Sequence, residues 1–522
     1  MYYYRILLLS FLLFTSLSFS FSQQWLGVNG SNYAGTNAIF NNPANVVDSR
    51  YSVYLNLTGA DAFMSNNYIQ WNGPYNYLAL FMNIAPAKYR NPVNDKLIYK
   101  DEYLEANTSD NIKHIYTTVE ARGPAAMVTL NNKNAVALST RVRTGLSFTG
   151  VSNVLANMVF NGVSTSSSIV GNDYMLPTTT FNLNSFGEIT ATYGRVLVSD
   201  EERFLKIGVN LKRLIGLYSA SFQIGENADF ILKQDPIDPA KSIININSLN
   251  LTYNYADDGA YKNIKPDFEW MTGQASAGSG WGMDLGLIYE FRPDVRKYSY
   301  RKKGVLTLDN SKNKYKYKLG VSLVDIGGIR FNNALYNHSY TVAVVGKTVN
   351  SSDFERMKGL QTTFDKVSSI LGVTPAQDTH DFTVALPTTI QFNMDYHLKD
   401  YYYLNTQWVQ NLRTSQSIGM QTPSLLAVTP RYERKWLEVA MPFALLDNYS
   451  VLAFGLSLRL GPVFIGSDNL GSLLNIAKPR GTDLYFGAAI PFFRKPPTTP
   501  NACWYEQQDK KTFKEKLLFW KK

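Results

Sequence analysis

The chain has 522 residues, of which 14% are aromatic and 18% are charged, a charged share below the roughly 25% of soluble domains. Its formal net charge is +10, yet no run of Lys and Arg with interleaved aromatics suggests a nucleic-acid partner. After residue 22 no apolar run approaches about eighteen residues, which excludes a helical inner-membrane protein.

The first residues have the pattern of an export signal. Arg5 supplies a positive charge, Ile6–Phe14 form a short apolar core, and Ser20–Ser22 form a small-x-small cleavage site. Residues 1–22 are therefore predicted to be a signal peptide. The single cysteine, Cys503, cannot form an internal disulfide. Either the chain avoids cysteine in an oxidising compartment, which is favoured, or this thiol pairs with a partner protein.

The rest of the chain repeats one pattern, in which apolar and polar residues alternate for eight to ten positions before a turn. Leu205–Leu211 and Ile390–Tyr396 are examples. A strand has a period of two, so each such segment has one apolar and one polar face. Many such strands behind an export signal predict an all-β, antiparallel transmembrane barrel, with lipid outside and water inside. We expect residues 51–493 to form a barrel of about 14 strands, within a range of about 12 to 16.

The strand patterns have a consistent order of short turns and long connections. In chain order they cover residues 51–58, 116–129, 135–146, 187–198, 204–214, 244–255, 283–291, 315–323, 386–398, 402–410, 424–432, 436–443, 452–460, 463–466 and 484–493. Barrels of this class have short periplasmic turns and long outer loops. We therefore expect the turns at 399–400 and 461–462 to face the periplasm, and the connections at 411–423 and 469–480 to face outward.

Two connections depart from the strand pattern. Apolar residues recur every three to four positions over Ser352–Leu371, which predicts an amphipathic helix. Residues 151–174 are rich in Ser, Asn and Gly and are predicted to be a second long loop, partly helical. Two roles remain open for these segments: they fold over or into the barrel mouth, or they are surface loops with one buried helical face.

The C-terminal part, residues 494–522, differs from a barrel wall. It starts with a proline-rich stretch, which is typical of a stiff linker, and continues as a basic tail. Phe513, Leu517 and Trp520 fall on one helical face of this tail. The tail is predicted to be periplasmic, and two interpretations are open: a helix that docks on a membrane surface or a protein partner, or a solvated tail that packs these residues under the barrel.

The polar strand faces supply the candidate ligand-contacting residues, because they would line the lumen and tune what passes. These residues are Lys206, Asn210, Lys212, Lys316, Lys318, Gln391, Asn393, Asp395, His397 and Arg459. The alternative is a closed lumen in which the charges pair with one another. With about 14 strands, a lumen filled by a plug and side chains is favoured over an open pore, since aqueous channels appear at about 16 to 18 strands.

Catalytic motifs are missing from the sequence. It has no His-Glu-x-x-His, no Gly-x-Ser-x-Gly and no Walker loop, and its four histidines are scattered. His397 and Asp395 share a strand face. Such a pair can form half of a metal site or an acid–base pair, but it is more often part of a lumen charge network. We therefore expect no enzymatic activity, no metal site and no cofactor.

Two stretches resemble known families. Asn41-Asn42-Pro43-Ala44, preceded by Tyr33-Ala34-Gly35, resembles the Asn-Pro-Ala segment that opens barrels of the long-chain fatty-acid transporter (FadL-like) class and of their PorV-like relatives. Leu386–Asp400, followed by Trp408, is similar to a late hairpin of those families. The order of parts also resembles an uncharacterised outer-membrane barrel family common in Bacteroidota.

The resemblance implies an outer-membrane protein in which residues 23–50, with Asn41, Asn42, Pro43 and Ala44, form a plug-like segment. Such a barrel contacts lipid and binds or passes a small hydrophobic ligand. The alternative is a barrel that docks in a secretion or surface-protein assembly, as the PorV-like relatives do. Transport predicts a continuous apolar pocket behind residues 23–50, whereas docking predicts none. The ligand-pocket residues of the family have no match by position here, so no substrate follows.

Overall fold

A computed structural model describes residues 25–496, apart from 162–169, 201, 238–240, 263–266, 274, 303–304, 351–352, 354–358 and 477–479. The predicted signal peptide and the basic tail with Phe513, Leu517 and Trp520 lie outside the described residues.

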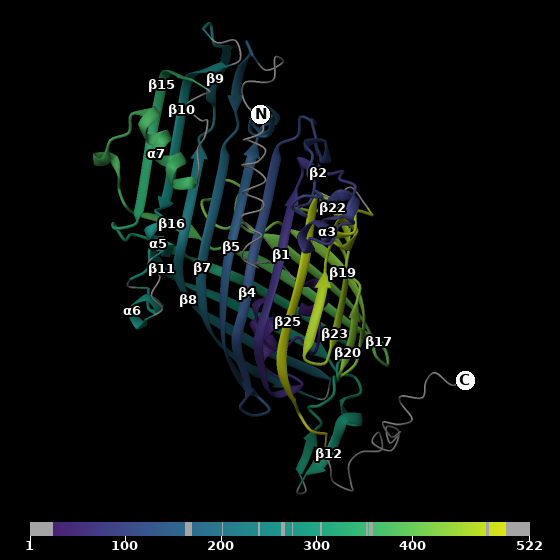
Figure 1. The fold of residues 1–522 in the computed structure, drawn as a ribbon. Coiled ribbons are helices and arrows are strands. Elements are labelled where there is room, and N and C mark those ends of the chain that lie inside the picture. The colour runs from purple at the N-terminus through teal and green to yellow at the C-terminus, as the bar shows by residue number, and fades with distance from the viewer. Residues whose placement is uncertain are drawn as a thin grey trace.

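Fourteen antiparallel stretches close into a barrel (Figure 1), which confirms the predicted fold class. Around the ring they are β1 (Tyr51–Asn66), β4 (Lys113–Thr129), β5 (Asn134–Val151), β7 (Thr179–Ser199), β8 (Arg203–Ile224), β11 (Gly278–Phe291), β14 (Tyr317–Phe331), β16 (Phe382–Ala385) with β17 (Thr389–Lys399), β18 (Tyr402–Asn411), β19 (Leu425–Glu433), β20 (Leu437–Ala440) with β21 (Phe443–Leu446), β22 (Val451–Phe454) with β23 (Leu456–Leu460), β24 (Val463–Ser467) and β25 (Gly481–Phe493). The first and last strands close the ring, with Tyr51 opposite Phe493 and Ser65 opposite Gly481.

The alternating pattern sorts side chains between the two faces of the wall. Ile207 and Leu211 on β8 are 38% and 52% exposed, whereas Lys206 and Asn210 on the same strand are 5% and 0% exposed. Other apolar side chains exposed on the wall include Leu57, Leu138, Val142, Leu287, Val321, Phe392, Leu426, Leu456, Ile465 and Ile490. This apolar belt is the surface that such a barrel presents to the lipid of an outer membrane.

One side of the wall rises well beyond the rest, at the upper end in Figure 1. β8 pairs with β11 as far as Gly216 and then, from Ala220, with β10 (Ser242–Ala256). β10 also pairs with β9 (Ala228–Gln234) and β15 (Asn337–Asn350), and β9 pairs with β6 (Asp173–Leu176). We call β6, β9, β10, β15 and the helix α7 the outer extension.

The predicted amphipathic helix is confirmed as α7 (Leu360–Leu371), and the first part of its predicted range lies mainly outside the described residues. Phe364 of α7 stacks on Tyr253 and Tyr255 of β10, with ring centroids 5.8 and 4.9 Å apart. The loop predicted to be partly helical contains α4 (Asn153–Asn161).

Short elements occupy the other connections and the lumen. They are α2 (Leu26–Asn29), η2 (Gly35–Phe40), η3 (Pro43–Val46), β2 (Ile69–Trp71), α3 (Tyr77–Met82), η4 (Ala87–Tyr89), η5 (Asp101–Tyr103), β3 (Leu104–Ala106), α5 (Gly259–Lys262), α6 (Phe268–Met271), η6 (Val295–Tyr298), β12 (Ser299–Lys302), β13 (Val305–Leu308), η8 (Pro375–Gln377) and α8 (Leu470–Leu473). β12 and β13 form a hairpin at the lower end of the barrel in Figure 1. Among the described helices, none has both the length and the apolar character needed to cross a membrane.

Candidate functional site: the filled lumen

Residues 25–50, which we call the N-terminal segment, pack against the inward faces of the strands. The segment makes no strand pairing, so its backbone groups need side-chain partners. Asn210 donates to the carbonyl of Ile39 at 3.1 Å, and Lys206 donates to that of Val47 at 3.1 Å. The hydroxyl of Ser322 donates to the Asn41 carbonyl at 2.7 Å. The wall therefore binds this segment through side chains of β8 and β14.

The Asn-Pro-Ala part of the segment meets the wall at glycines. The amide of Asn42 donates to the carbonyls of Leu287 on β11 and Val321 on β14, at 3.2 and 3.1 Å. A Cβ atom at Gly286 would collide with Asn42, and one at Gly208 would collide with Pro43. Glycine at these two wall positions is what allows the backbones to approach this closely.

The other side of the N-terminal segment is apolar. Ile39, Val46 and Val47 belong to one buried cluster with Tyr54 of β1 and Met127 of β4. The cluster also contains Phe40, Tyr51, Ala135, Ala137, Val196, Phe204 and Ala489. The segment thus presents a hydrophobic face toward the strands from β25 through β1, β4, β5 and β7 to the start of β8.

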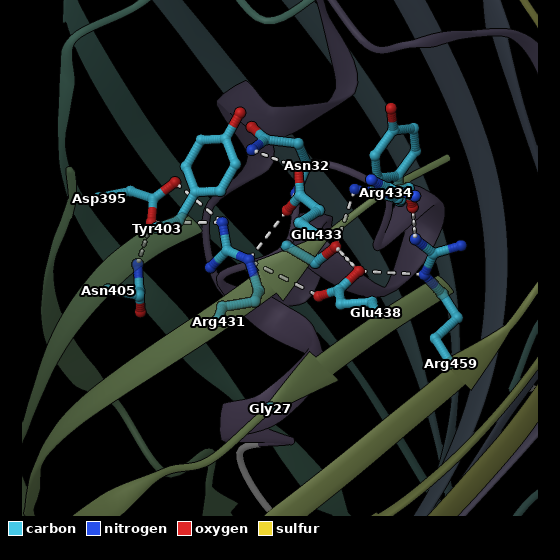
Figure 2. A network of polar contacts seen from close by, with 12 residues as sticks. Gly27, Asn32, Asp395, Tyr403, Asn405, Arg431, Glu433, Arg434, Glu438 and Arg459 are labelled. Carbon is cyan, nitrogen blue, oxygen red and sulfur yellow. Dashed lines mark hydrogen bonds and ion pairs between the residues drawn. The ribbon is translucent and has the colours of Figure 1, made fainter. Parts of the chain in front are cut away.

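On the opposite wall, the segment lies against a buried ion-pair network, shown in Figure 2. Arg431 of β19 contacts Asp395 at 3.1 Å and Glu433 at 2.9 Å, and Arg459 of β23 contacts Glu438 at 3.0 Å. All five side chains are at most 8% exposed. A buried charge that loses its partner is strongly destabilising, so this network fixes the inner surface of β17 to β23.

The N-terminal segment is bonded directly to this network. Ser31 donates its hydroxyl to Glu438 at 2.7 Å, and the backbone N–H of Asn32 donates to Glu433 at 3.1 Å. The Asn32 side chain donates to Glu433 at 3.0 Å (Figure 2) and to the Tyr315 hydroxyl at 2.6 Å. The contacts with Glu433 and Glu438 are charge-assisted hydrogen bonds, which are stronger than neutral ones.

A second network crosses the upper lumen. Arg141 of β5 contacts Glu188 of β7 at 2.6 Å, and Arg143 contacts Asp325 of β14 at 2.6 Å. Lys212 of β8 also reaches Asp325, at 2.5 Å. The network is completed by Glu120, Arg122 and Asp284. Its four cations face four anions, so their charges balance.

The connection between β18 and β19, residues 412–424, folds into the lumen, and we call it the inward loop. Thr149 of β5, Asn182 of β7 and Gln223 of β8 donate to the carbonyls of residues 415–417, at 2.6, 3.2 and 2.6 Å. The prediction that this connection faces outward concerns the orientation of the barrel in the membrane and stays a prediction. The contacts of the inward loop with strands on the far wall show that it spans the upper mouth.

A cavity of about 60 Å³, the central chamber, lies between the two inserted segments. Asn29 and Asn41 of the N-terminal segment, Met420 and Thr422 of the inward loop, and the second ion-pair network line it. At about 10–15 Å³ per water it has room for roughly four waters. A further cavity of about 10 Å³ lies between the N-terminal segment and β24 and β25. Neither has the several hundred Å³ of a ligand pocket, so neither is the apolar pocket expected for transport.

A third charged group lies at the lower rim. Arg292 contacts Asp48 of the N-terminal segment at 2.6 Å, and the ammonium of Lys314, in the connection before β14, donates to the side chain of Asn310 at 3.2 Å. Burial lowers the pKa of Lys314 to about 7; Asp48 opposes this effect, and Arg50 adds to it.

The structure places most of the predicted lumen residues inside. Lys206, Asn210, Lys212, Lys318, Gln391, Asp395 and Arg459 are buried. Asn393 is half-buried and accepts from Asn405 at 3.2 Å, and His397 stacks on Tyr403 at the lower rim with centroids 4.7 Å apart.

Lys316, which was also predicted to face the lumen, does not lie among these buried residues. β14 begins only at Tyr317, so the alternation does not extend back to Lys316 and Tyr315. The ammonium of Lys316 lies 4.6 Å from the ring centroid of Tyr396 and donates to the carbonyl of His397 at 2.9 Å. Tyr315, expected on the apolar face, is instead buried and donates to Asp395 at 2.5 Å.

Most charged partners inside the lumen were missed by sequence reasoning. They are Glu120 with Arg122, Arg141 with Arg143, Glu290 with Arg292, and Arg431 with Glu433. Each pair is two positions apart in a strand or at its end, and strand residues two apart share a face. That spacing is the signal that would have found them.

Comparisons with known proteins identify the family of this chain and several similar barrels. The model of a family described as "Family of unknown function (DUF5723)" matches residues 43–468. The chain belongs to this family. A search of curated proteins finds no match.

Several solved barrels are similar to this DUF5723 chain. A TodX monoaromatic hydrocarbon channel mutant (deltaS2S3) is 10% identical, with 91% of this chain and 97% of that chain covered and a TM-score of 0.35. The Ralstonia pickettii toluene transporter TbuX is 12% identical, with 88% and 94% covered and a TM-score of 0.33. A Pseudomonas aeruginosa FadL homologue is 11% identical, with 91% and 98% covered and a TM-score of 0.29. FadL-like barrels are thus among the similar structures, but TM-scores below 0.5 support no statement about ligand or mechanism.

Proposed function

We propose that this protein is an outer-membrane barrel that passes a small hydrophobic ligand when the N-terminal segment moves away from the apolar side of the wall. The observation that carries the proposal is the unlike character of the two sides of that segment. Ile39, Val46 and Val47 face apolar wall residues, whereas Ser31 and Asn32 are bonded to buried carboxylates.

The two sides differ in what a movement would cost. On the apolar side a hydrophobic ligand can replace the apolar contacts that the segment gives up, because hydrophobic contact is non-directional. The hydrogen bonds from Asn210 and Lys206 to the Ile39 and Val47 carbonyls would break in this movement. On the charged side a movement leaves buried carboxylates without donors, which is expensive. The ligand path therefore runs along the wall strands of the apolar cluster, from β25 through β1, β4 and β5 to β7, with the segment still held to β19 and β20. The small polar central chamber requires such a movement before a ligand can pass.

The experiment is a reversible crosslink between the N-terminal segment and the wall. A Cβ built at Gly194 of β7 lies 3.4 Å from the Cβ of Val47, close to the 3.5–4.5 Å of a disulfide. It would also collide with Cγ1 of Val46, so V46A is added to every variant of this experiment and to the parent. We would combine V47C and G194C with C503S, so that no other thiol remains, and follow entry of the fluorescent probe N-phenylnaphthylamine into cells that express the barrel.

We expect the oxidised double variant to admit the probe no faster than cells without the barrel, and reduction to restore entry. The single variants V47C and G194C, each with C503S, are the controls and should behave as the parent does. Equal entry in the oxidised and reduced states would contradict a moving N-terminal segment. Equal entry with and without the wild-type barrel would contradict hydrophobic transport.

Docking in a surface assembly is the second candidate, favoured by the outer extension and by the small size of the two lumen cavities. Leu335, beside the extension, and Val345 on β15 are 77% and 80% exposed. Docking predicts that other outer-membrane or periplasmic proteins copurify with the barrel and are lost when residues 501–522 are deleted. An unchanged set of proteins and an unchanged membrane yield after that deletion would remove its support.

A further inference from the structure

Three metal-ligating side chains meet in the outer extension, away from the lumen. His338 is near the start of β15, and Asp378 and His380 follow η8 in the connection from α7 to β16. The carboxylate oxygen Oδ2 of Asp378 lies 2.6 Å from Nδ1 of His338 and 3.3 Å from Nδ1 of His380. The chain has only four histidines, and two of them share this one carboxylate.

The backbone orients this carboxylate toward the two imidazoles. Oδ1 of Asp378 accepts the N–H groups of Ser339 and His380, at 2.9 and 3.0 Å. Oδ2 faces the two histidines, and the side chain of Tyr340 is hydrogen-bonded to the same carboxylate. Asp378 is 3% exposed at its side chain, whereas His338 and His380 are 27% and 40% exposed, so the cluster opens to solvent on the imidazole side.

Both imidazoles are held in place by their surroundings. The His338 ring stacks on Tyr255 of β10, with centroids 4.9 Å apart. Nδ1 of His380 lies 2.7 Å from the Asn337 carbonyl, in a hydrogen bond that holds the ring and that a metal bound to this nitrogen would replace. His380 has a φ of 52°, in the left-handed region that side chains other than glycine seldom adopt. Strained backbone of this kind gathers at functional sites.

We propose that His338, Asp378 and His380 bind a divalent transition-metal ion, with Zn²⁺ as the best match. Two imidazoles and one carboxylate are a known ligand set of zinc sites in which the protein supplies three ligands and the fourth position stays open for water or substrate. The candidate ligand atoms all lie within 4.8 Å of one another. Bonds of about 2.0–2.2 Å to a tetrahedral ion separate ligand atoms by roughly 3.3 Å. Relative to that spacing, the His338–Asp378 pair at 2.6 Å would open by less than about 1 Å, and the two imidazoles would adjust within the 4.8 Å that now bounds all three ligand atoms.

A bound ion would join the connection after α7 to the first residues of β15. Tyr253 and Tyr255 of β10 already contact α7, through hydrogen bonds to Ser368 at 2.7 Å and Asp365 at 3.2 Å. The metal would thus link the connection after α7 to β15, while β10 already contacts α7, and it would stabilise the outer extension. This role is independent of any ligand that passes through the lumen.

The test uses the full-length protein in detergent, purified with an affinity tag that contains no histidine. Co²⁺ is added first, because its visible absorption reports coordination by imidazole, and Zn²⁺ is then added to displace it. We expect one Co²⁺ per chain, displaced by one Zn²⁺. H338Q and H380Q should each weaken binding at least about tenfold.

The matched control is H114Q. His114 also contacts one carboxylate, with Nε2 at 2.9 Å from both oxygens of Asp447, but no second histidine shares that carboxylate among the described residues. H114Q should bind the metal as the wild type does. Each variant is first checked for the gel shift on heating that a folded barrel shows.

X-ray absorption on the wild-type Zn²⁺ complex makes the test independent of any variant. Two imidazole ligands are expected in the spectrum. A wild-type protein that binds neither metal, a spectrum with oxygen ligands alone, or undiminished binding in the folded H338Q/H380Q double variant would each overturn the proposal.

Discussion

The two segments that fill the lumen are held in very different ways. The N-terminal segment is almost wholly buried, with apolar packing on one side and carboxylate acceptors on the other. The inward loop is partly exposed over residues 412–418, and side chains of three strands donate to its backbone carbonyls. Regions with few buried contacts open locally at a low free energy. We therefore expect the inward loop to open at a lower free energy than the N-terminal segment.

The largest effect is expected from R431A, which removes the central cation of the network under the N-terminal segment. Asp395 and Glu433 would be left buried without it, and a broken buried pair costs about 3–5 kcal/mol. The folding free energy is followed by the gel shift on heating in a series of urea concentrations. R434A, an exposed neighbour on the same hairpin, is the control. A loss no greater than that of R434A would show that the network does not stabilise the lower lumen.

A smaller effect is expected from pH at the lower rim. Lys314 has a pKa of about 7 in the folded chain because it is buried, and about 10.4 when unfolded. Between these values the unfolded chain binds the extra proton, so stability should rise with pH, by about 2 kcal/mol from pH 7 to pH 9. K314M should lose this rise, whereas K399M, in an exposed turn, should keep it. Parallel pH profiles for wild type and K314M would contradict a neutral buried lysine.

The smallest effect is expected at the inward loop, from N182A. Asn182 donates to the carbonyl of Ser417 and accepts the N–H of Gly419 at 3.0 Å. Its loss should destabilise the closed loop by about 1 kcal/mol. Trypsin cleavage after Arg413, whose rate follows the population of the open loop, should become faster. N184A changes the same face of β7, where Asn184 accepts from Ser219 instead, and should leave the rate unchanged.

The barrel wall was predictable because alternation is a local property of each strand. Leu205–Leu211 shows its two faces without any knowledge of its neighbours, and a count of such runs is close to the strand number. The limits of the prediction are also local: β14 begins at Tyr317, and the pattern alone extends it to Tyr315.

The lumen was less predictable, because its contacts join residues far apart in the chain. A Ser-, Thr- and Gln-rich stretch such as 411–423 has the composition of a solvent-exposed loop. Only its contacts with Thr149 and Asn182, on strands far from it in the sequence, turn it inward. His338 and Asp378 are 40 positions apart, so no spacing motif could have joined them.

The point where the N-terminal segment becomes the wall has a consequence for biogenesis. The segment ends at Arg50, β1 starts at Tyr51, and the Arg50 carbonyl accepts the N–H of Arg494, directly after the last strand, at 3.0 Å. β1, one of the two strands that close the ring, thus follows directly on the N-terminal segment that occupies the lumen. We therefore expect the N-terminal segment to enter the lumen before the first strand pairs with the last, because later entry would have to pass a closed ring.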